Sequence, residues 1–306
     1  MNLQIGLVGL GKMGYNLALN MKKHGYHVIA QDVNAASVEE INKEGDIVGV
    51  NTPEQLCTAF DKNQKHRAIW LMVPSGKIVD IVIDSIVPHL SPGDIIIDGG
   101  NSNFNDSVKR YNALKEKGIS FLDCGTSGGM SGALHGACTM IGGDADVFAY
   151  VEKLFKDISV QDGYLYCGAA GSGHFCKMVH NGIEYGMMQA MAEGFEVLQH
   201  SKYNYDFEHV AKMWSNGSVI RGWLMELAQD AFSKDAKLDA ITGIMNSSGE
   251  GRWTLDAALD MGIATPVIAM SLLMRYRSQQ TDTFSGKVVA ALRNEFGGHA
   301  VVKKEG

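Results

Sequence analysis

The stretch Leu3-Gln-Ile-Gly-Leu-Val8-Gly9-Leu-Gly11-Lys-Met-Gly14 decides the fold that we expect for the first part of the chain. An apolar run typical of a β-strand ends at the pattern G-x-G-x-x-G, and a helical pattern follows over residues 15–23. In such a unit the first glycine permits a tight turn, the second lets a pyrophosphate approach the backbone, and the third lets helix and strand pack closely. The stretch therefore predicts the phosphate-binding turn of a dinucleotide-binding domain.

A second expected strand, 27–31, ends at Asp32, which lies 18 residues after Gly14. In dinucleotide-binding domains an acidic residue about 20 residues beyond the glycine pattern binds the ribose. A carboxylate there accepts a hydrogen bond from a 2′-hydroxyl group and repels a 2′-phosphate group. We therefore expect NAD as the cofactor. The alternative is a glycine turn and a loop aspartate that coincide by chance.

Strand-like and helical segments alternate after Asp32. The expected strands are 68–73, 94–98, 120–123, 137–142 and 163–167, with helices from about 76, 105 and 144. This alternation predicts an α/β fold with a mostly parallel, doubly wound sheet of the Rossmann type. Ligands of such sheets bind outside the carboxyl ends of the strands. The polar segments 73–76, 98–102 and 125–129 are expected there as loops, although the same residues are ordinary in turns.

The composition changes after Gly173, and helical patterns dominate the rest of the chain. The expected helices are 175–200, 207–213, 220–232 and 266–277. We therefore expect two domains: a Rossmann-like dinucleotide-binding domain over 1–167, and an all-α domain over 168–306 for substrate binding and dimerisation. The second domain is expected to end in a C-terminal tail over 293–299.

The first of these helices carries Lys177, His180, Asn181 and Glu184 at positions i, i+3, i+4 and i+7. Such spacings share one helix face over two turns, about 10 Å. An amine, an imidazole, a carboxamide and a carboxylate would therefore converge along a face long enough for a six-carbon substrate. A solvated stripe on an ordinary helix is the alternative.

The chain has 306 residues and 45% apolar residues, enough for two domains with sizeable cores. No apolar run approaches the roughly 20 residues that a membrane-spanning helix needs. The amino terminus has no secretion-signal pattern, so we expect a cytoplasmic protein without a membrane segment. The net charge of −7 disfavours nucleic-acid binding.

The five cysteines, Cys57, Cys124, Cys138, Cys167 and Cys176, include no C-x-x-C pair. Their odd number and spacing argue against a disulfide framework and against a zinc site. We expect these cysteines to be reduced and mostly buried. We expect no metal in the site.

Several segments together are similar to motifs of the 6-phosphogluconate dehydrogenase family: Asp98-Gly-Gly-Asn101-Ser, Ser127-Gly128-Gly129, Lys177-Met-Val-His180-Asn181-Gly-Ile-Glu184-Tyr185 and Arg293-Asn-Glu-Phe-Gly-Gly-His299. The chain resembles the short, NAD-type, decarboxylating form of that family, within the wider β-hydroxyacid dehydrogenase group. This resemblance covers nearly the whole chain. Its most specific part is the segment from Lys177 to Glu184.

The resemblance implies the site. The residues expected to bind NAD are Gly9, Gly11, Lys12, Met13, Gly14, Asp32, Val73 and Asn101. The expected catalytic residues are Lys177, Glu184, Asn181 and His180. The residues expected to bind a sugar-acid phosphate are Asn101, Ser127, Gly128, Gly129, His180, Asn181, Tyr185, Arg275, Arg293 and His299.

The chain also departs from the longer NADP-type members of the family. Ser248 and Glu250 stand where those enzymes carry a lysine and a threonine for the phosphate, and Met130-Ser131 replaces two acids. Asp32-Val33-Asn34 follows the second strand, where those enzymes have Asn-Arg-Thr. The second helical repeat is absent, and a partner subunit usually supplies it. We therefore expect a homo-oligomer, a dimer or a tetramer, with shared active sites.

The implied reaction is the oxidative decarboxylation of 6-phosphogluconate to ribulose 5-phosphate in the pentose phosphate pathway. Lys177 would act as a base, which requires a lowered pKa and a neutral amine, and Glu184 would deliver a proton to carbon. One alternative is a non-decarboxylating 3-hydroxyacid dehydrogenase of the hydroxyisobutyrate type, which has no use for the second acid. The other is a catalytically silent NAD-binding sensor.

Overall fold

The computed structural model describes residues 3–303. The chain forms two compact units, residues 1–181 and 182–306. The division between them lies inside one long helix, α8 (Ser172–Gln199). The domain boundary that we expected near residue 168 stays a prediction.

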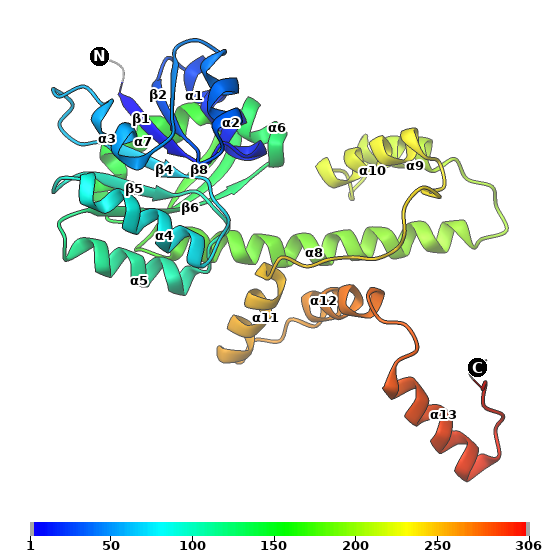
Figure 1. Ribbon diagram of the computed structural model, residues 1–306. Helices are drawn as coiled ribbons and strands as arrows, with labels where there is room; N and C mark the ends of the chain where they lie inside the picture. Colours follow the sequence, from blue (N-terminus) through cyan, green and yellow to red (C-terminus); the bar gives the residue numbers. More distant parts are fainter. Residues whose placement is uncertain (1–2, 304–306) are drawn as a thin grey trace. The chain divides into compact units, whose positions relative to one another are not determined.

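The first unit is built on one eight-stranded sheet with the strand order β3-β2-β1-β4-β5-β6-β7-β8 (Figure 1). Its strands are β1 (Gln4–Val8), β2 (His27–Gln31), β3 (Ile47–Val50), β4 (Ala68–Leu71), β5 (Ile95–Asp98), β6 (Ser120–Ser127), β7 (Ala137–Gly143) and β8 (Ser159–Gly168). All neighbouring strands are parallel except β6 and β7. The order reverses at β1, as in a doubly wound Rossmann sheet, so the expected fold is confirmed.

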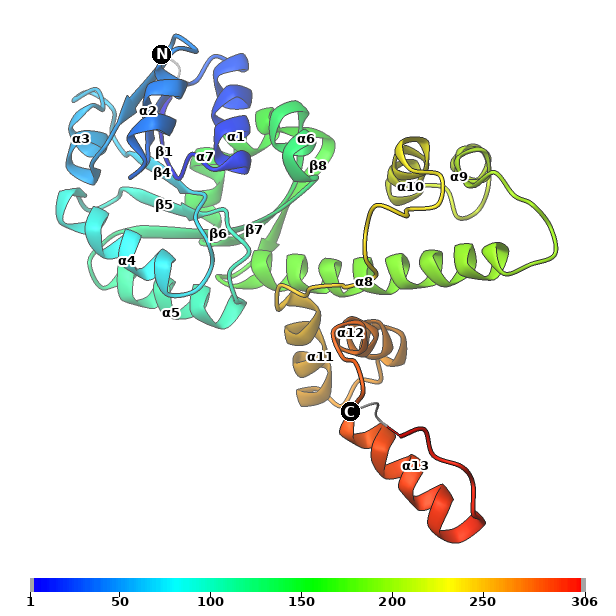
Figure 2. The same cartoon turned by 45° about the vertical axis from the view of Figure 1, so that its right-hand side comes forward.

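Helices cover both faces of this sheet (Figure 2). They are α1 (Lys12–Lys23), α2 (Ala35–Asn42), α3 (Pro53–Thr58), α4 (Lys77–Ile86), the 3₁₀ turn η1 (Val87–His89), α5 (Phe104–Lys115), α6 (Gly129–His135) and α7 (Ala145–Ile158). Leu17 of α1 and Phe155 of α7 belong to the core on one face. Ile83 of α4 and Leu114 of α5 belong to the core on the other. The central strands β4 and β5 are buried along their whole length because both faces of the sheet are covered there.

The structure corrects one expectation about the sheet. Residues 125–127 do not form a loop, because β6 continues to Ser127, which pairs with Cys138 of the antiparallel strand β7. The sequence pattern stopped the strand at Asp123, where the apolar run ends. Pairing with β7 carries the strand through the polar residues that follow.

The second unit is helical, as expected. After α8 it contains α9 (Phe207–Ser215), α10 (Trp223–Lys234), α11 (Glu250–Asp260), α12 (Pro266–Ser278) and α13 (Phe284–Gly297). Phe195 of α8 packs against the rings of Phe207, Trp214 and Phe232, and these aromatic contacts join α9 and α10 to α8. The sequence analysis missed α11 and α13. None of the helices described within residues 3–303 is long and apolar enough to cross a membrane.

The start of α8 is fixed to the sheet by a buried carboxylate. Asp123 lies on β6 and is fully buried. Its side chain accepts hydrogen bonds from the backbone N–H groups of Gly171 (2.6 Å) and His174 (2.8 Å). These groups belong to the amino end of the helix, which has no intrahelical acceptor for them and where a negative charge is favourable.

The backbone of α8 also lies directly on that of the sheet. A Cβ atom on Gly173 would lie 2.4 Å from the carbonyl oxygen of Met140 and 2.7 Å from that of Asp123. A Cβ atom on Gly125 would lie 2.2 Å from the Cβ atom of Lys177. No side chain separates helix and strands here, so the stem of Lys177 rests on the main chain of β6.

We predict that Asp123→Asn lowers the free energy of unfolding by about 2–3 kcal/mol, because the amide keeps only one acceptor for two buried N–H groups. Urea denaturation measures this loss. The matched control is Asp84→Asn on the exposed side of α4, which should change stability by less than about 0.5 kcal/mol. Equal stability of the two variants would contradict the role given to Asp123.

Candidate active site

The glycine turn between β1 and α1 has the geometry that a bound pyrophosphate requires. Gly9 has φ +97°, and a Cβ atom there would lie 2.4 Å from the carbonyl oxygen of Met72. A Cβ atom on Gly14 would lie 1.9 Å from the carbonyl oxygen of Gly9. In contrast, a Cβ atom on Gly11 would meet nothing within 4 Å. Gly9 and Gly14 therefore serve the packing, and Gly11 leaves space for a ligand.

Helix α1 begins at this turn without a side-chain cap and without an acidic residue in its first turn. Lys12 at its first position is exposed and Met13 is half-buried. The N–H groups at the start of a helix favour an anion through both hydrogen bonding and the helix dipole. These residues fit the pyrophosphate of a dinucleotide.

Asp32 lies directly beside the glycine turn. Its carboxylate accepts a hydrogen bond from the backbone N–H of Leu10 (2.6 Å) and another from that of Asn34 (2.8 Å). The backbone N–H of Gly9 donates to the carbonyl oxygen of Gln31 (2.8 Å). The carboxylate is therefore held at the carboxyl ends of β1 and β2, next to the turn that would hold the pyrophosphate.

Val73 and Asn101 follow the carboxyl ends of the next two strands in the sheet, β4 and β5. Val73 is half-buried and Asn101 is exposed. The residues that we expected to bind NAD thus lie along one edge of the sheet, after the four adjacent strands β2, β1, β4 and β5. This edge contains the point where the strand order reverses, the usual site of ligand binding in such sheets.

A compact polar cluster surrounds Lys177 on α8. Lys177 Nζ donates a hydrogen bond to Asn181 Oδ1 (2.7 Å) and lies 3.3 Å from His180 Nδ1. His180 Nδ1 lies 3.0 Å from Asn181 Oδ1, and His180 Nε2 lies 3.2 Å from the hydroxyl of Ser127. Lys177 and Asn181 are buried and His180 is half-buried. The structure therefore brings three of the expected catalytic residues and one expected substrate-binding residue together.

Two neutral forms of His180 are compatible with these distances. In one, Nδ1–H donates to its neighbours and Nε2 accepts from Ser127; in the other, Nδ1 accepts from Lys177 and Nε2–H donates to Ser127. The imidazole can thus face Lys177 as a donor or as an acceptor. Such a cluster can accommodate an amine that gains and loses a proton.

Ser127, Gly128 and Gly129 form the end of β6 and the entry to α6. Gly128 has φ +115° and Gly129 has φ +58°, both in the left-handed region that favours glycine. These two glycines let the chain turn sharply after Ser127, next to His180. Met130 and Ser131 follow, and both side chains are exposed.

Glu184 lies seven residues after Lys177 on the same helix and is half-buried. Seven residues of α-helix correspond to about 10 Å along the axis. Glu184 belongs to the second compact unit, whereas Lys177, His180 and Asn181 belong to the first. Its role in catalysis stays a prediction.

Within the second unit, Tyr185 and Arg275 form a separate polar group. The guanidinium carbon of Arg275 lies 3.5 Å from the centre of the Tyr185 ring, a cation–π contact. Arg275 Nη1 donates to the carbonyl oxygen of Asn246 (2.8 Å), and the backbone N–H of Ser248 donates to the Tyr185 hydroxyl (3.3 Å). The hydroxyl of Ser248 donates to the buried carboxylate of Glu250 (2.5 Å). An acid therefore lies close to the expected phosphate-binding residues.

Arg293 and His299 do not join this group. Arg293 lies in α13 and is exposed, and His299 follows that helix. Asn294 Nδ2 donates to the carbonyl oxygen of His299 (2.9 Å). In the part of the chain that the structure describes, residues 3–303, no hydrogen bond, ion pair or ring contact connects Arg293 or His299 with Tyr185 or Arg275. The segment that we expected to be a tail is thus mostly the end of a helix.

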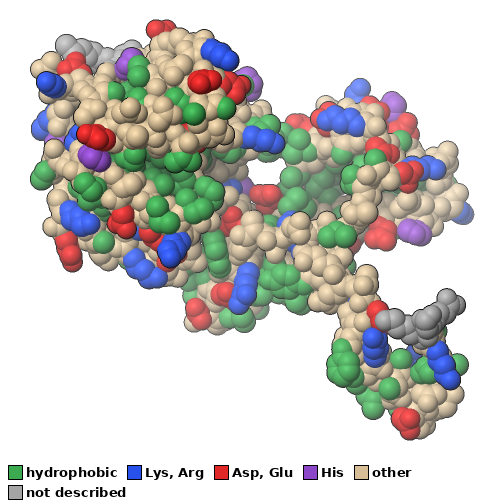
Figure 3. Space-filling model, in the orientation of Figure 1, with side chains coloured by type: hydrophobic (Ala, Val, Ile, Leu, Met, Phe, Trp, Pro, Cys, Tyr) green, Lys and Arg blue, Asp and Glu red, His purple; other side chains and the backbone are tan. Residues whose placement is uncertain are grey.

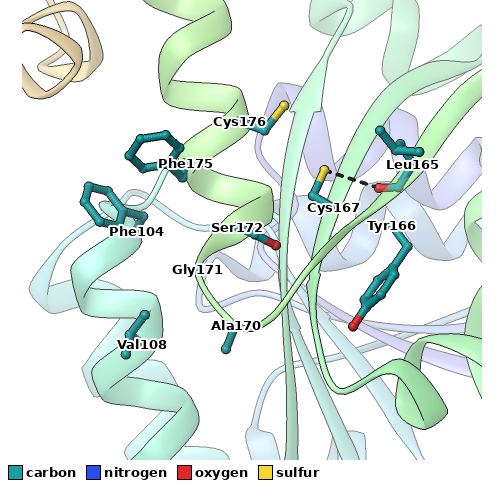
Figure 4. Close-up of a pocket in the computed structure, with 10 residues that line it drawn as sticks. All are labelled: Phe104, Val108, Leu165, Tyr166, Cys167, Ala170, Gly171, Ser172, Phe175 and Cys176. Atoms are coloured by element: carbon teal, nitrogen blue, oxygen red, sulfur yellow. Dashed lines mark hydrogen bonds between the residues drawn. The ribbon is translucent and has the colours of Figure 1, made fainter. Parts of the chain in front are cut away.

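The burial of the cysteines differs from what we expected. Cys57 and Cys124 are buried, but Cys138 and Cys176 are exposed and Cys167 is intermediate, so they are not mostly buried. Cys167 and Cys176 line an open pocket of about 580 Å³ between β8, α5 and the start of α8 (Figure 4). Burial raises the pKa of the Cys167 thiol to about 11. At neutral pH this thiol stays protonated and weakly reactive.

Sequence reasoning missed three buried polar groups that lie behind the expected site residues. The first is Asp123 at the start of α8. The second is a buried pair in which Ser107 Oγ of α5 lies 2.7 Å from His174 Nδ1 of α8. The third is Arg110 of α5, which bonds to Asp98. The glycines at 171 and 173 could have indicated close packing at the helix start, but no local pattern identifies Ser107 or Arg110.

Two family models match most of the chain. Residues 4–168 match the NAD binding domain of 6-phosphogluconate dehydrogenase, and residues 173–292 match the C-terminal domain of 6-phosphogluconate dehydrogenase. A Bacillus subtilis protein provisionally named 6-phosphogluconate dehydrogenase YqeC is 57% identical over 99% of this chain and 100% of that protein. The NAD(+)-dependent, decarboxylating 6-phosphogluconate dehydrogenase of Haloferax volcanii is 39% identical over 99% of this chain and 100% of that enzyme.

Solved structures agree with these matches. Plasmodium falciparum 6-phosphogluconate dehydrogenase, described with its cofactor NADP+ and its substrate 6-phosphogluconate, has a TM-score of 0.82 and 30% identity over 98% of this chain and 66% of that chain. The 3-hydroxyisobutyrate dehydrogenase of Salmonella typhimurium has a TM-score of 0.73 and 17% identity over 90% of this chain and 94% of that chain, which shows a shared fold only.

The doubly wound sheet, its glycine turn and the helical second unit define a dinucleotide-binding oxidoreductase. The chain belongs to the 6-phosphogluconate dehydrogenase family. The resemblance seen in the sequence is therefore confirmed. The expectation of NAD is also confirmed, because residues 4–168 form the NAD-binding domain of this family.

The glycine turn yields a prediction from two similar substitutions. Gly11→Ala should keep the free energy of unfolding within about 0.5 kcal/mol, because its Cβ atom meets nothing in the protein. It should weaken NAD binding at least about tenfold, because the methyl group occupies the space of the pyrophosphate.

Gly14→Ala should instead destabilise the protein by about 3 kcal/mol, because its Cβ atom would collide with the Gly9 carbonyl group. Urea denaturation and calorimetric titration with NAD separate the two effects. Undiminished NAD affinity in Gly11→Ala would mean that the pyrophosphate binds elsewhere.

Proposed function

We propose that this protein oxidises and decarboxylates 6-phosphogluconate, with NAD as the oxidant, to give ribulose 5-phosphate and carbon dioxide. The observation that carries the proposal is the buried Lys177–Asn181 hydrogen bond (2.7 Å), with His180 and Ser127 adjoining it. The family membership and the name of the Haloferax volcanii relative support the choice of substrate. Activity in the cytoplasm stays a prediction.

In the first step, Lys177 in its neutral form accepts the proton of the substrate's 3-hydroxyl group as the hydride leaves carbon 3. NAD, when bound along the sheet edge, supplies the hydride acceptor. Asn181 and His180 hold the Lys177 amine in place. Ser127 and His180 would bind the carboxylate and hydroxyl groups of the sugar acid, together with Asn101 and the backbone at Gly128 and Gly129.

The product of this step is a β-keto acid. Lys177, now an ammonium group, gives its proton to the new carbonyl oxygen as the bond to the carboxylate breaks and carbon dioxide leaves. An enediol remains. Glu184 in its acid form, two turns further along α8, then gives a proton to substrate carbon 2, which becomes carbon 1 of the ketose, while Lys177 takes back the proton of the enediol hydroxyl group. This last role distinguishes the proposal from a simple 3-hydroxyacid dehydrogenase, which does not require a second acid.

The phosphate end of the substrate would bind to the Tyr185 and Arg275 group. Arg293 and His299 would complete that end from a partner subunit, since neither contacts Tyr185 or Arg275 through the bonds described within residues 3–303. Figure 3 shows apolar side chains on the surface at α13, which a partner could cover. Leu292 (57% exposed) and Phe296 (78%) are among the exposed apolar residues of this helix. These features support a homo-oligomer with shared sites.

The test of the proposed function is an assay of the purified protein with 6-phosphogluconate and NAD. We expect NADH and carbon dioxide in equal amounts, and much lower activity with 3-hydroxyisobutyrate or unphosphorylated gluconate. NADH formation without carbon dioxide would indicate the non-decarboxylating alternative. Binding of NAD without turnover of any of these substrates would indicate the silent sensor.

The two proposed catalytic residues should have different effects. Lys177→Met should lower kcat by at least about 10³-fold while NAD affinity stays within twofold, because the base acts only when the proton moves. Glu184→Gln should still produce NADH in a first turnover and then stall before ketose formation. Rapid-quench analysis of NADH and ribulose 5-phosphate distinguishes the variants, and wild-type rates in either one refute its role.

Asp32 should determine the choice between NAD and NADP. We expect kcat/KM to be at least about 100-fold higher with NAD, because the carboxylate repels a 2′-phosphate and loses its hydroxyl partner. Asp32→Ser should narrow this ratio by raising kcat/KM for NADP. A wild-type preference for NADP would contradict the role of Asp32.

A further inference from the structure

We propose that Arg110 is a positioning residue that sets the geometry of the NAD-binding edge by joining the loops after β4 and β5. The inference rests on the proposed function, in which NAD is the oxidant. Arg110 lies in α5 outside the glycine turn and is only 6% exposed. Neither the sequence motifs nor the comparisons assign it a role.

One side of the guanidinium group binds the β4 loop and the helix that follows it. Arg110 Nη2 donates to the carbonyl oxygen of Gly76 (3.0 Å), which precedes α4. Arg110 Nε donates to Asp80 Oδ1 in the first turn of α4 (2.7 Å). The segment that carries Val73 is therefore held at its far end by Arg110.

The other side binds the β5 loop. Arg110 Nη1 donates to Asp98 Oδ2 (3.3 Å) and to the hydroxyl of Ser102 (3.2 Å). The Ser102 hydroxyl donates to Asp98 Oδ2 (2.7 Å), and the backbone N–H of Gly100 donates to Asp98 Oδ1 (3.2 Å). Residues 98–102 thus form a closed hydrogen-bonded loop around a fully buried carboxylate, with Asn101 exposed at its tip.

The two loops also touch each other. A Cβ atom on Gly100 would lie 3.0 Å from the carbonyl oxygen of Val73. A change in the distance between the loops therefore moves both Val73 and Asn101, the residues placed along the cofactor edge. A binding site keeps its affinity only when the groups behind its contact residues fix their positions.

Lysine cannot replace this arginine without loss. A guanidinium group presents five N–H donors in a rigid plane, which suits acceptors on two sides, whereas an ammonium group is a compact point charge. Arg110→Lys keeps the positive charge near Asp98, so the buried carboxylate is not left without a counter-ion. The substitution therefore removes the bridge between the loops and retains the charge balance.

The chain provides a matched control at the opposite end of the same two strands. Arg67 precedes β4 and binds Asp94, which precedes β5, through Nε (2.9 Å) and Nη2 (2.5 Å). This pair also joins two segments through a partly buried arginine and a carboxylate. It lies at the amino ends of the strands, away from the edge that would bind NAD.

The experiment compares Arg110→Lys and Arg67→Lys in the full-length protein by calorimetric titration with NAD, urea denaturation and steady-state kinetics. Both variants should lose stability to a similar extent. Arg110→Lys should bind NAD about tenfold more weakly and raise KM for NAD, because the loops that carry Val73 and Asn101 are displaced. Its kcat should stay within about twofold of the wild-type value, because the Lys177 cluster is unchanged. Arg67→Lys should keep the wild-type affinity for NAD.

The inference is overturned if folded Arg110→Lys binds NAD as tightly as the wild type does. It is also overturned if Arg110→Lys and Arg67→Lys lose NAD affinity to the same extent. If Arg110→Lys does not fold, Asp80→Asn removes only the half-exposed end of the bridge and should weaken NAD binding about threefold. Unchanged affinity in that variant also overturns the inference. Failure of the wild-type protein to bind NAD would instead refute the proposed function.

Discussion

The carboxylate of Asp123 is the interaction on which the arrangement of the site depends. It lies buried on β6 and binds two backbone N–H groups at the start of α8, so the helix begins at a fixed point above β6. Lys177 follows one turn later and rests on Gly125. A buried charge is costly unless it is hydrogen-bonded, and here the helix start provides the donors. The position of the Lys177 amine therefore follows from the electrostatics of the sheet interior.

The first unit contains both the cofactor edge and the Lys177 cluster, and different parts of the structure hold each of them in place. The cofactor edge is formed by backbone turns after four strands, and its shape depends on glycines and on bonds made by Asp32 and Asp98. The Lys177 cluster is formed by side chains on one helix, with Ser127 from β6 as a partner. Both lie after the carboxyl ends of strands in a single sheet. A rigid sheet thus provides the common frame on which hydride donor and acceptor could be brought together.

Features that depend on near neighbours in the chain could be predicted from the sequence, and features that depend on distant pairing could not. The glycine turn and the Lys177–Asn181 hydrogen bond follow from local periods of strand and helix. The extension of β6 requires β7, and the contact of Ser127 with His180 joins residues 53 positions apart. Helix α13 was missed because its glycines and polar residues near Arg293 looked like a tail. Arg110 was missed because its acceptors come from two segments, 76–80 and 98–102, that lie before its own helix in the chain.

The close contact between the start of α8 and the sheet has a consequence for how this protein can change over time. The close approach of Lys177 to β6 requires glycine at positions 125 and 173, because a Cβ atom at either position would collide with the helix or with the strands. Apolar residues such as Phe148 and Phe155 pack on the other face of the sheet. They can be replaced by larger or smaller apolar residues without moving the Lys177 amine away from β6. Most core positions can therefore change in evolution, whereas the glycines at the contact between α8 and the sheet cannot be replaced without moving Lys177.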